Sequence, residues 1–479
     1  MIVEQDLVYV GHEVPTLPDG WSMTTLEQLV SIQGLFSDGD WVESKDQDPN
    51  GDVRLIQLAD IGVGSYRDRS DRYLTSERAS ALSCSFLERG DILVARMPDP
   101  LGRACIFPGD KRRAVTVVDV AIVRPNNPDV SNRWLMHRIN SMAFRNAVAS
   151  LQSGSTRLRI SRKNLARIAF PLPPLVEQIA AVEEIEKQFS RLDEAVANLQ
   201  RVKANLKRYK ASVLKAAVEG RLVETEASIA QREGRSYETG EQLLQRILDE
   251  RRAKWSGKGK YKEPLPHDVQ GLPKAPEGWV WCSLDLVAAE TLIGLDRGRD
   301  QQRAEPVGVR YVKMNNVSMD GDVQTDELVY VDATPEEVAR YEVANGDLLF
   351  NTRNSLELVG KVGIVRSIPA CTVFNNNLMR IRTCGGVSPV FLGYQMCAFE
   401  FRQRMEKVKK ATTSVAAVYQ KDLLPLAIAL PPESEQVRIV AEIDRHLSII
   451  REVEAEVDTN LQRAQALRQS TLSEAFATV

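Results

Sequence analysis

Hydrophobic residues recur every three or four positions along two long stretches of the chain, with charged residues between them. The first stretch carries Ile185, Phe189, Leu192, Val196, Leu199, Leu206 and Val213, and the second carries Ile443, Leu447, Ile450, Val457, Leu461 and Ala464. This spacing predicts two coiled-coil helices. Each helix is expected to begin at a Pro-Pro pair, because proline is tolerated in a first helical turn.

The segments before these helices have a different pattern, in which glycines separate short runs rich in Val, Ile and Leu. The runs are Asp91–Ala95, Val115–Val123, Asp347–Phe350 and Val362–Val365. They predict strands of a mixed sheet. A helical stretch then follows in each half, at Arg133–Ala149 and at Phe391–Lys407.

One constant offset relates the two halves of the chain. The segment Pro18–Trp21 recurs 258 positions later as Pro276–Trp279, and Glu177–Gln178 recurs at the same offset as Glu435–Gln436. The repeat is far longer than that of a solenoid, so it indicates a duplicated domain. We therefore expect approximate two-fold symmetry.

The sequence predicts an α+β fold, in which two mixed α/β domains are separated by two long antiparallel coiled-coil helices. The predicted segments are 1–172 (first domain), 173–223 (first long helix), 224–275 (linker with a short helix), 276–430 (second domain) and 431–479 (second long helix). Thr239 and Gln242 fit a capping box at the start of the short helix. Each long helix would have about 45 residues and a length of roughly 65–70 Å.

Composition excludes several classes of protein. The 479 residues include 62 Lys and Arg against 65 Asp and Glu, so the chain is not a uniformly basic nucleic-acid coat. Hydrophobic residues make up 43%, which excludes a disordered chain. The sequence has no uninterrupted apolar run of about 18 residues, so no membrane span is expected. The six cysteines form no CxxC pair, which argues for reduced thiols in the cytoplasm and against a zinc site.

Motifs of catalysis are missing from the sequence. The chain has no P-loop, no GxSxG elbow and no Asn/Asp-Pro-Pro-aromatic motif of the kind that amino-methyltransferases use. Asp19, Glu43 and Lys45 mimic a metal-dependent nuclease triad, but their spacing is loose and Glu277 stands for Asp19 in the second copy. We predict a non-catalytic protein that binds no metal and no cofactor.

Charge is distributed unevenly, since no Asp or Glu occurs in 130–176 or in 358–399. A local positive surface is typical of contact with a polyanion such as DNA. In the first domain the candidate DNA-binding residues are Arg96, Arg103, Lys111, Arg112, Arg113, Arg157, Arg159, Arg162 and Lys163. In the second domain they are Lys313, Asn315, Asn316, Arg353, Asn354, Lys361, Lys409 and Lys410.

The long helices are also expected to offer a second face to partner proteins. The candidate partner-binding residues are Phe189, Leu192, Leu206, Tyr209, Leu447 and Leu461. Part of this set is expected to form the internal seam of the coiled coil.

The most distinctive stretches of sequence are Pro171–Gln178, Phe189–Asp193, Lys203–Leu222, Glu241–Leu248, Lys260–Pro264 and Pro276–Trp281. Together with the Gly-Asp-Ile-Leu and Gly-Asp-Leu-Leu strands, they resemble the specificity (S) subunits of type I restriction–modification systems. The resemblance covers essentially the whole chain, and its central block is highly specific.

This resemblance implies that each domain is a target-recognition domain that reads one half of a split, asymmetric site in double-stranded DNA. It implies that the helices set the gap between the halves and dock two modification (methyltransferase) subunits. Those subunits would use S-adenosylmethionine to methylate adenine, and restriction subunits would use ATP and Mg²⁺ in phage defence. Because target domains of this family diverge strongly, the resemblance identifies no base-reading residue, and the candidate contacts rest on charge.

Two other interpretations stay open from the residues. One is a coiled-coil scaffold without a DNA role, for which DNA binding would lack salt dependence. The other is a stand-alone nuclease that uses Asp19, Glu43 and Lys45, which would nick DNA with Mg²⁺ alone.

Overall fold

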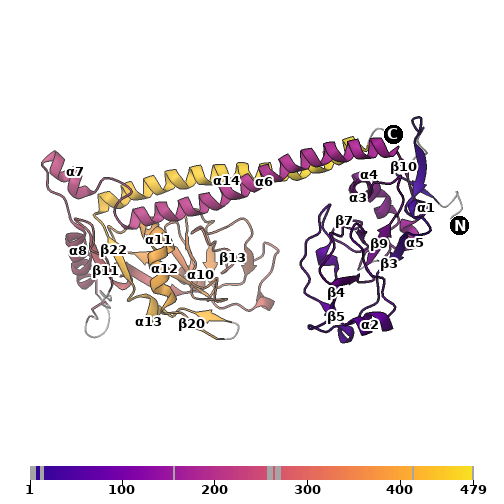
Figure 1. Ribbon diagram of the computed structural model, residues 1–479. Helices are drawn as coiled ribbons and strands as arrows, with labels where there is room; N and C mark the ends of the chain where they lie inside the picture. The colour runs from indigo at the N-terminus through magenta and orange to yellow at the C-terminus, as the bar shows by residue number, and fades with distance from the viewer. Residues whose placement is uncertain are drawn as a thin grey trace. The chain divides into compact units, whose positions relative to one another are not determined.

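The computed structural model describes residues 7–10, 16–154, 157–255, 261, 263–264, 271–412 and 415–476 (Figure 1). The chain divides into two compact units. Unit 1 comprises Met1–Arg201 and Val457–Val479, and unit 2 comprises Val202–Glu456. Each of the two long helices therefore contributes residues to both units. No described helix combines the length and the apolar character that crossing a membrane requires.

The described residues of unit 1 form three small sheets and five short α-helices besides the long ones. A four-stranded antiparallel sheet has the order β3 (Leu35–Asp38), β9 (Val120–Arg124), β6 (Ile92–Ala95), β7 (Ala104–Ile106). A mixed sheet has the order β5 (Tyr73–Leu74), β4 (Val53–Ile56), β8 (Arg113–Thr116), and a third has β1 (Val8–Tyr9), β10 (Ile168–Leu172), β2 (Ser22–Thr25). The helices are α1 (Leu26–Leu29), α2 (Ser76–Ala81), α3 (Asn132–Asn140), α4 (Met142–Ser150) and α5 (Arg162–Leu165).

Unit 2 repeats this plan. Its antiparallel sheet has the order β12 (Ala288–Ile293), β19 (Leu378–Thr383), β15 (Leu348–Asn351), β17 (Val362–Ile364). Its mixed sheet is β14 (Val329–Val331), β13 (Val309–Val312), β18 (Thr372–Phe374), and β11 (Val280–Ser283) pairs with β22 (Ala427–Leu430). A further small sheet is β16 (Arg353–Asn354), β21 (Ala416–Ala417), β20 (Lys410–Ala411). The helices of this domain are α9 (Leu284–Val287), α10 (Pro335–Tyr341), α11 (Pro389–Cys397), α12 (Phe399–Glu406) and α13 (Gln420–Leu423).

The predicted duplication is confirmed by the pairing of the strands. In both units the middle strand of the mixed sheet, β4 or β13, pairs antiparallel with one neighbour and parallel with the other. In both units the four-stranded sheet is antiparallel throughout. The same topology has therefore been built twice from sequences that share few residues.

A buried glutamine fastens the start of each long helix to its domain. The Gln178 side chain accepts a hydrogen bond from the Ser131 backbone N–H at 2.9 Å, and Gln436 accepts one from Ser388 at 2.7 Å. Both glutamines are fully buried. The Glu-Gln repeat in the sequence thus marks an equivalent structural joint in each unit.

The Gly-Asp motifs mark a second repeated joint. Asp91 accepts hydrogen bonds from the Glu88 N–H at 2.8 Å and from Arg124 Nε at 2.6 Å. In unit 2, Asp347 caps a turn in the same way and binds Arg382 Nε at 2.7 Å. Both aspartates are buried, so each carboxylate joins the turn before one strand to the neighbouring strand of the four-stranded sheet.

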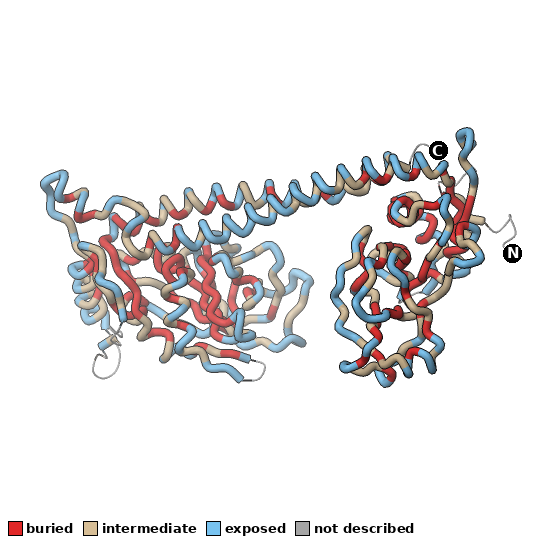
Figure 2. The backbone as a smooth tube through the Cα atoms, viewed as in Figure 1, coloured by how far each residue is buried: buried red, intermediate tan, exposed pale blue. Residues whose placement is uncertain are grey.

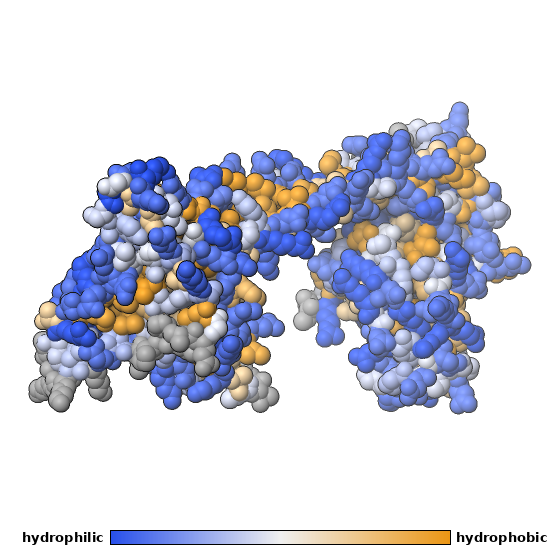
Figure 3. All heavy atoms as spheres, turned by 60° about the vertical axis from the view of Figure 1, so that its left-hand side comes forward, coloured by the Kyte–Doolittle hydropathy of each residue, from blue (hydrophilic) through white to orange (hydrophobic). Residues whose placement is uncertain are grey.

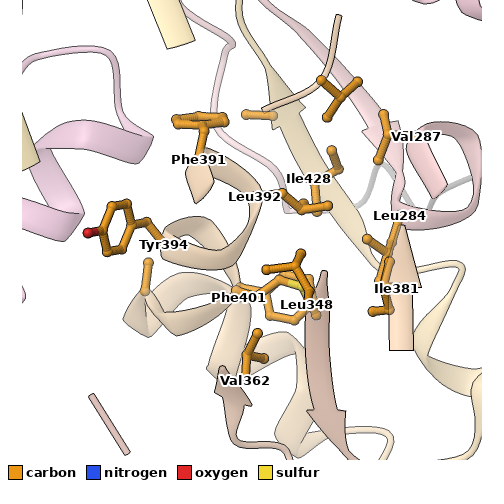
Figure 4. Close-up of a cluster of buried hydrophobic side chains, with 14 of the residues drawn as sticks. Leu284, Val287, Leu348, Val362, Ile381, Phe391, Leu392, Tyr394, Phe401 and Ile428 are labelled. Carbon is orange, nitrogen blue, oxygen red and sulfur yellow. The ribbon is translucent and has the colours of Figure 1, made fainter. Parts of the chain in front are cut away.

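Buried residues concentrate in the sheets and the short helices of each unit (Figure 2). In unit 2, side chains of α11 and α12 lie against the sheet strands (Figure 4). The labelled residues of this core include Phe391, Leu392, Phe401, Leu348, Ile381 and Ile428. Burial of these apolar surfaces holds the helices on the sheet.

The long helices are α6 (Leu175–Val218, 44 residues) and α14 (Glu433–Ala475, 43 residues). In unit 1, Arg468 binds Asp193 at 2.8 Å, and the Thr471 hydroxyl donates to Gln188 at 3.2 Å. From the first pair to the second, the residue number rises along α14 and falls along α6. The two helices therefore run antiparallel, as predicted. The seam positions Ile443, Leu447 and Ile450 of unit 2 are buried, as their spacing predicts.

The segment predicted as a linker, 224–275, differs from the prediction. It contains two helices, α7 (Glu226–Glu233) and α8 (Gly240–Ala253). The predicted capping box is confirmed, since Thr239 accepts from the Gln242 N–H at 3.2 Å and Gln242 accepts from the Thr239 N–H at 2.9 Å. Leu243 and Ile247 of α8 are buried in the core of unit 2, so this segment is part of that unit.

His137 of α3 is a buried histidine in unit 1. Its ring meets the Phe189 ring edge-on, with centroids 5.7 Å apart, and within the described residues Nε2 has no hydrogen-bond partner. Burial lowers the pKa of His137 to about 4, and the charges of Arg133 and Arg468 act in the same direction. Glu186 lies 3.6 Å from Nε2, but it is engaged by Arg133 at 2.7 Å.

We expect unit 1 to lose stability as the pH falls. Because the folded pKa lies below the unfolded value of about 6.5, the contribution of neutral His137 is complete above that pH and is lost towards pH 4. The loss would reach about 3 kcal/mol. Hydrogen exchange of α3 peptides in the full chain measures it, and His137→Gln should flatten the profile. An unchanged slope in that variant would contradict the assignment, and His446→Gln in unit 2 is the control.

Candidate nucleic-acid interface

Arg96 organises the first group of predicted DNA contacts, in unit 1. It follows β6, pairs with Asp38, and donates from Nε to the Ile160 carbonyl at 2.9 Å. Ser153 and Arg159 exchange backbone hydrogen bonds at 2.9 Å, which closes the loop that leads to Ile160. The Arg96 side chain is therefore mostly covered, and it holds the basic loop on the sheet.

The exposed cations around this anchor form what we call the first basic surface: Arg157, Arg159, Arg162 and Lys163. Arg162 lies 3.7 Å from Asp38 and donates to the Phe36 carbonyl at 2.9 Å. Arg157 and Arg159 are exposed on the loop, and Lys163 is exposed on α5. The structure therefore brings together five residues that the charge pattern had selected.

The second group lies on the small sheet β16-β21-β20 of unit 2. Arg353 and Lys410 both stand opposite Ala417 in the strand registers, so one strand separates them. Lys409 donates to the Leu356 carbonyl at 3.3 Å, and its side chain is mostly covered. Exposed Arg353 and Lys410 with half-buried Asn354 form the second basic surface.

Arg103 and Lys361 are corrections to the predicted contacts. Arg103 is 5% exposed and donates to backbone carbonyls, among them that of Ile61 at 2.7 Å. Lys361 is 7% exposed and donates to the carbonyls of Met314 and Val317 at 2.9 and 2.5 Å. These equivalent cations tie loops to the sheet, and burial leaves them no surface for DNA.

Asn316 is also structural. Its side chain accepts from the Lys313 N–H at 2.9 Å and donates to the Glu327 carbonyl at 3.1 Å, which closes a turn. Lys313 is half-buried and Asn315 is exposed on the same turn. Of these three predicted contacts, Asn315 has the most accessible side chain.

The remaining predicted cations, Lys111, Arg112 and Arg113, are exposed at the start of β8. The Arg112 guanidinium lies over the Tyr73 ring at 4.6 Å, and that of Arg113 lies over Phe86 at 3.3 Å. They belong to the mixed sheet, whereas Arg96 belongs to the four-stranded sheet. They therefore form a group separate from the first basic surface.

Comparison with known proteins relates the whole chain to one functional class. No family model matches the chain. The specificity subunit of the type I restriction enzyme EcoKI from Escherichia coli K12 is 23% identical, over 74% of this chain and 67% of that protein. The EcoBI specificity subunit of Escherichia coli is 23% identical, over 99% of this chain and 88% of that protein. The EcoAI specificity subunit of Escherichia coli is 21% identical, over 95% of this chain and 83% of that protein.

Over nearly its whole length this chain is similar to type I specificity subunits. A solved chain from a study of complex assembly and conformational transition in a type I restriction–modification system has the same fold. It superposes with a TM-score of 0.63 at 19% identity, over 97% of this chain and 99% of that chain. The predicted fold class is confirmed, and the scaffold and nuclease interpretations receive no support from these relatives.

The long helices place the predicted partner-binding residues in different environments. Leu447 is only 3% exposed and lies in the core of unit 2. It packs within the chain and offers no surface to a partner protein. Phe189, Leu192, Leu206 and Leu461 are half-buried, and the Arg468 guanidinium lies 4.5 Å above the Phe189 ring. Tyr209 is exposed, with its hydroxyl 2.9 Å from His446 Nδ1.

Other apolar residues of the long helices are exposed although the seam pattern does not select them. They are Val176, Ile179 and Leu467 in unit 1 and Val202, Val437 and Ile449 in unit 2. Figure 3 shows hydrophobic residues at the surface along these helices. Ile179 and Val437 are separated by the repeat offset of 258, and that equivalence is the sequence signal that could have found them.

The structure gives the nuclease-like residues ordinary contacts. Glu43 and Lys45 form an ion pair with each other at 2.5 Å at the surface of unit 1. Among the described residues, no group of three or more His, Cys, Asp or Glu side chains has the geometry to hold a metal ion. Named relatives of this chain are specificity subunits of type I restriction enzymes.

Proposed function

We propose that this chain is a specificity subunit that directs a type I restriction–modification complex to a bipartite, asymmetric DNA site. Each unit reads one part of the site with its own domain. The observation that carries this proposal is the pairing of one repeated topology with two different basic surfaces. We call the two short sequences of a bipartite site its two words. A duplicated scaffold with diverged contacts suits a site with two different words better than a palindromic site.

We infer further that the long helices set the gap between the two words and dock two modification subunits. The exposed apolar residues of both units support a protein contact along the helices. Chemistry in the complex would come from the partners, which would use S-adenosylmethionine for methylation and ATP with Mg²⁺ for restriction. This chain would supply DNA sequence readout and spacing.

We expect variants of the basic surfaces to weaken DNA binding in a salt-dependent way. Removal of one cation that binds a DNA phosphate should reduce the slope of log K against log salt concentration by about 0.9. The double variant Arg353→Ala/Lys410→Ala, in the complex with modification subunits, should therefore lower the slope by about 1.8. Binding to DNA is measured across a salt series.

Lys187→Ala is the matched control, because Lys187 is an exposed cation of α6 engaged by Glu184 at 3.4 Å. It should leave the slope unchanged. If the double variant also leaves the slope unchanged while the control behaves as expected, the second basic surface does not contact phosphates.

A further inference from the structure

Trp41 is a large apolar side chain on the surface of unit 1, with 70% of it exposed. Its indole N–H points to Glu43 Oε1 at 3.4 Å. Beside it lies a hollow of about 400 Å³ that is also lined by Gln57, Leu58, Val118 and Asp119. A tryptophan left so exposed at the rim of a hollow has no packing role that explains it.

The backbone holds Trp41 in place on both sides. Asp40 N–H donates to the Thr116 carbonyl at 2.7 Å, and the Asp40 carboxylate accepts from the Ser85 N–H at 3.0 Å. Gly39 runs so close to β8 that a Cβ there would meet the Val117 carbonyl oxygen at 2.2 Å. The tryptophan therefore stands on a fixed segment, which lowers the conformational entropy lost on binding.

The hollow adjoins the first basic surface through Arg96. Arg96 Nη1 donates to the Val118 carbonyl at 3.0 Å, and the Arg96 N–H donates to the Asp119 carbonyl at 2.8 Å. Two residues of the hollow are thus bonded directly to the anchor of the basic loop. A polyanion that lies on the basic surface would bring its neighbouring groups to the hollow.

Asp119 has a half-buried carboxylate that makes no hydrogen bond or ion pair to any part of the chain that the structure describes. A carboxylate repels phosphates, so Asp119 does not serve the backbone of a nucleic acid. It is an acceptor, and the exocyclic amino groups of cytosine and adenine are donors on base edges. The combination of flanking cations, an aromatic face and a free acceptor fits a nucleobase.

The equivalent point of unit 2, where the structure describes residues 294–296, has different chemistry. Gly294 approaches β18 as Gly39 approaches β8, and Leu295 bridges to Asn375 in parallel as Asp40 bridges to Val117. The residue that follows is Asp296, at the place of Trp41. The two units therefore present different chemistry at an equivalent point of the fold, as the reading of two different words requires.

We infer that Trp41 and Asp119 determine one position of the DNA word read by unit 1. Trp41 packs its ring against a base, and Asp119 accepts a hydrogen bond from the amino group of a cytosine or an adenine. This inference rests on the proposed function. Neither residue is needed for the packing of the core, so substitution leaves the domain folded.

The test is methylation mapping in cells that express the full chain with its modification subunits. Trp41→Ala and Asp119→Ala should each relax one position of one word by about tenfold or more, with the other word and the gap unchanged. Trp41→Phe, which keeps an aromatic face, should retain the word. Ile32→Ala is the control, because Ile32 is fully exposed in unit 1 outside the hollow.

The outcomes separate the two hypotheses. A bipartite wild-type motif with both words unchanged in Trp41→Ala and Asp119→Ala would overturn this inference and leave the proposed function standing. Relaxation of both words together would also overturn it. Absence of any bipartite motif in the wild-type methylome would refute the proposed function itself.

Discussion

Removal of one heptad from both long helices is expected to move the two DNA words closer together by about three base pairs. Seven helical residues span about 10.5 Å, and base pairs are spaced by about 3.4 Å. Deletion of 198–204 in α6 and 453–459 in α14 removes segments where each helix passes from one unit to the other. A whole heptad keeps the seam in phase, so the paired helices should still form.

Methylated motifs of the wild-type and the shortened subunit are compared to measure this effect. Both words should persist with a shorter gap, and sites with the original gap should lose methylation. A control that deletes seven residues from α6 alone should abolish methylation, because the seams no longer match. An unchanged gap in the double deletion would refute the idea that the helices act as a ruler.

Asp91→Ala is expected to destabilise unit 1 by about 3 kcal/mol. The substitution leaves the Glu88 N–H and the Arg124 guanidinium without their buried acceptor. Hydrogen exchange of β6 and β9 peptides measures the free energy of opening of this sheet. Asp91→Asn keeps an acceptor for the turn and should cost less.

Glu184→Ala, which removes an exposed partner of Lys187 on α6, should change hydrogen exchange in unit 1 little. Unit 2 provides an internal reference, since its equivalent joint at Asp347 is untouched. Equal opening of β6 peptides in the Asp91→Ala variant and the wild type would show that the joint does not support the sheet.

The sequence predicted the architecture because its signals are periodic and repeated. Heptads, Pro-Pro helix starts and an offset of 258 identify the long helices and the duplication without knowledge of any contact. The strands were predictable from a different signal. A strand that is buried on both faces of its sheet is continuously apolar. In segment 224–275 the predicted short helix is α8, whereas α7 was not predicted because its buried residues are Glu226, Ala227 and Ala230, which give no strong apolar signal.

The candidate site was predictable in part. Charge alone selected Arg157, Arg159 and Arg353 at the surface, but it equally selected Arg103 and Lys361, which are buried. A cation that donates to backbone carbonyls and one that faces solvent have the same sequence signature. Trp41 was not among the predicted DNA contacts, because a single tryptophan in a sequence is expected to be a core residue unless its exposure is known.

The most direct test of the proposed function is the methylome of cells with and without this chain, with its partner subunits present in both. If the proposed function is correct, one bipartite, asymmetric motif with a fixed gap is methylated only when the chain is present. A methylome that is identical in the two strains, while the modification subunits are expressed and bound to the chain, would contradict it.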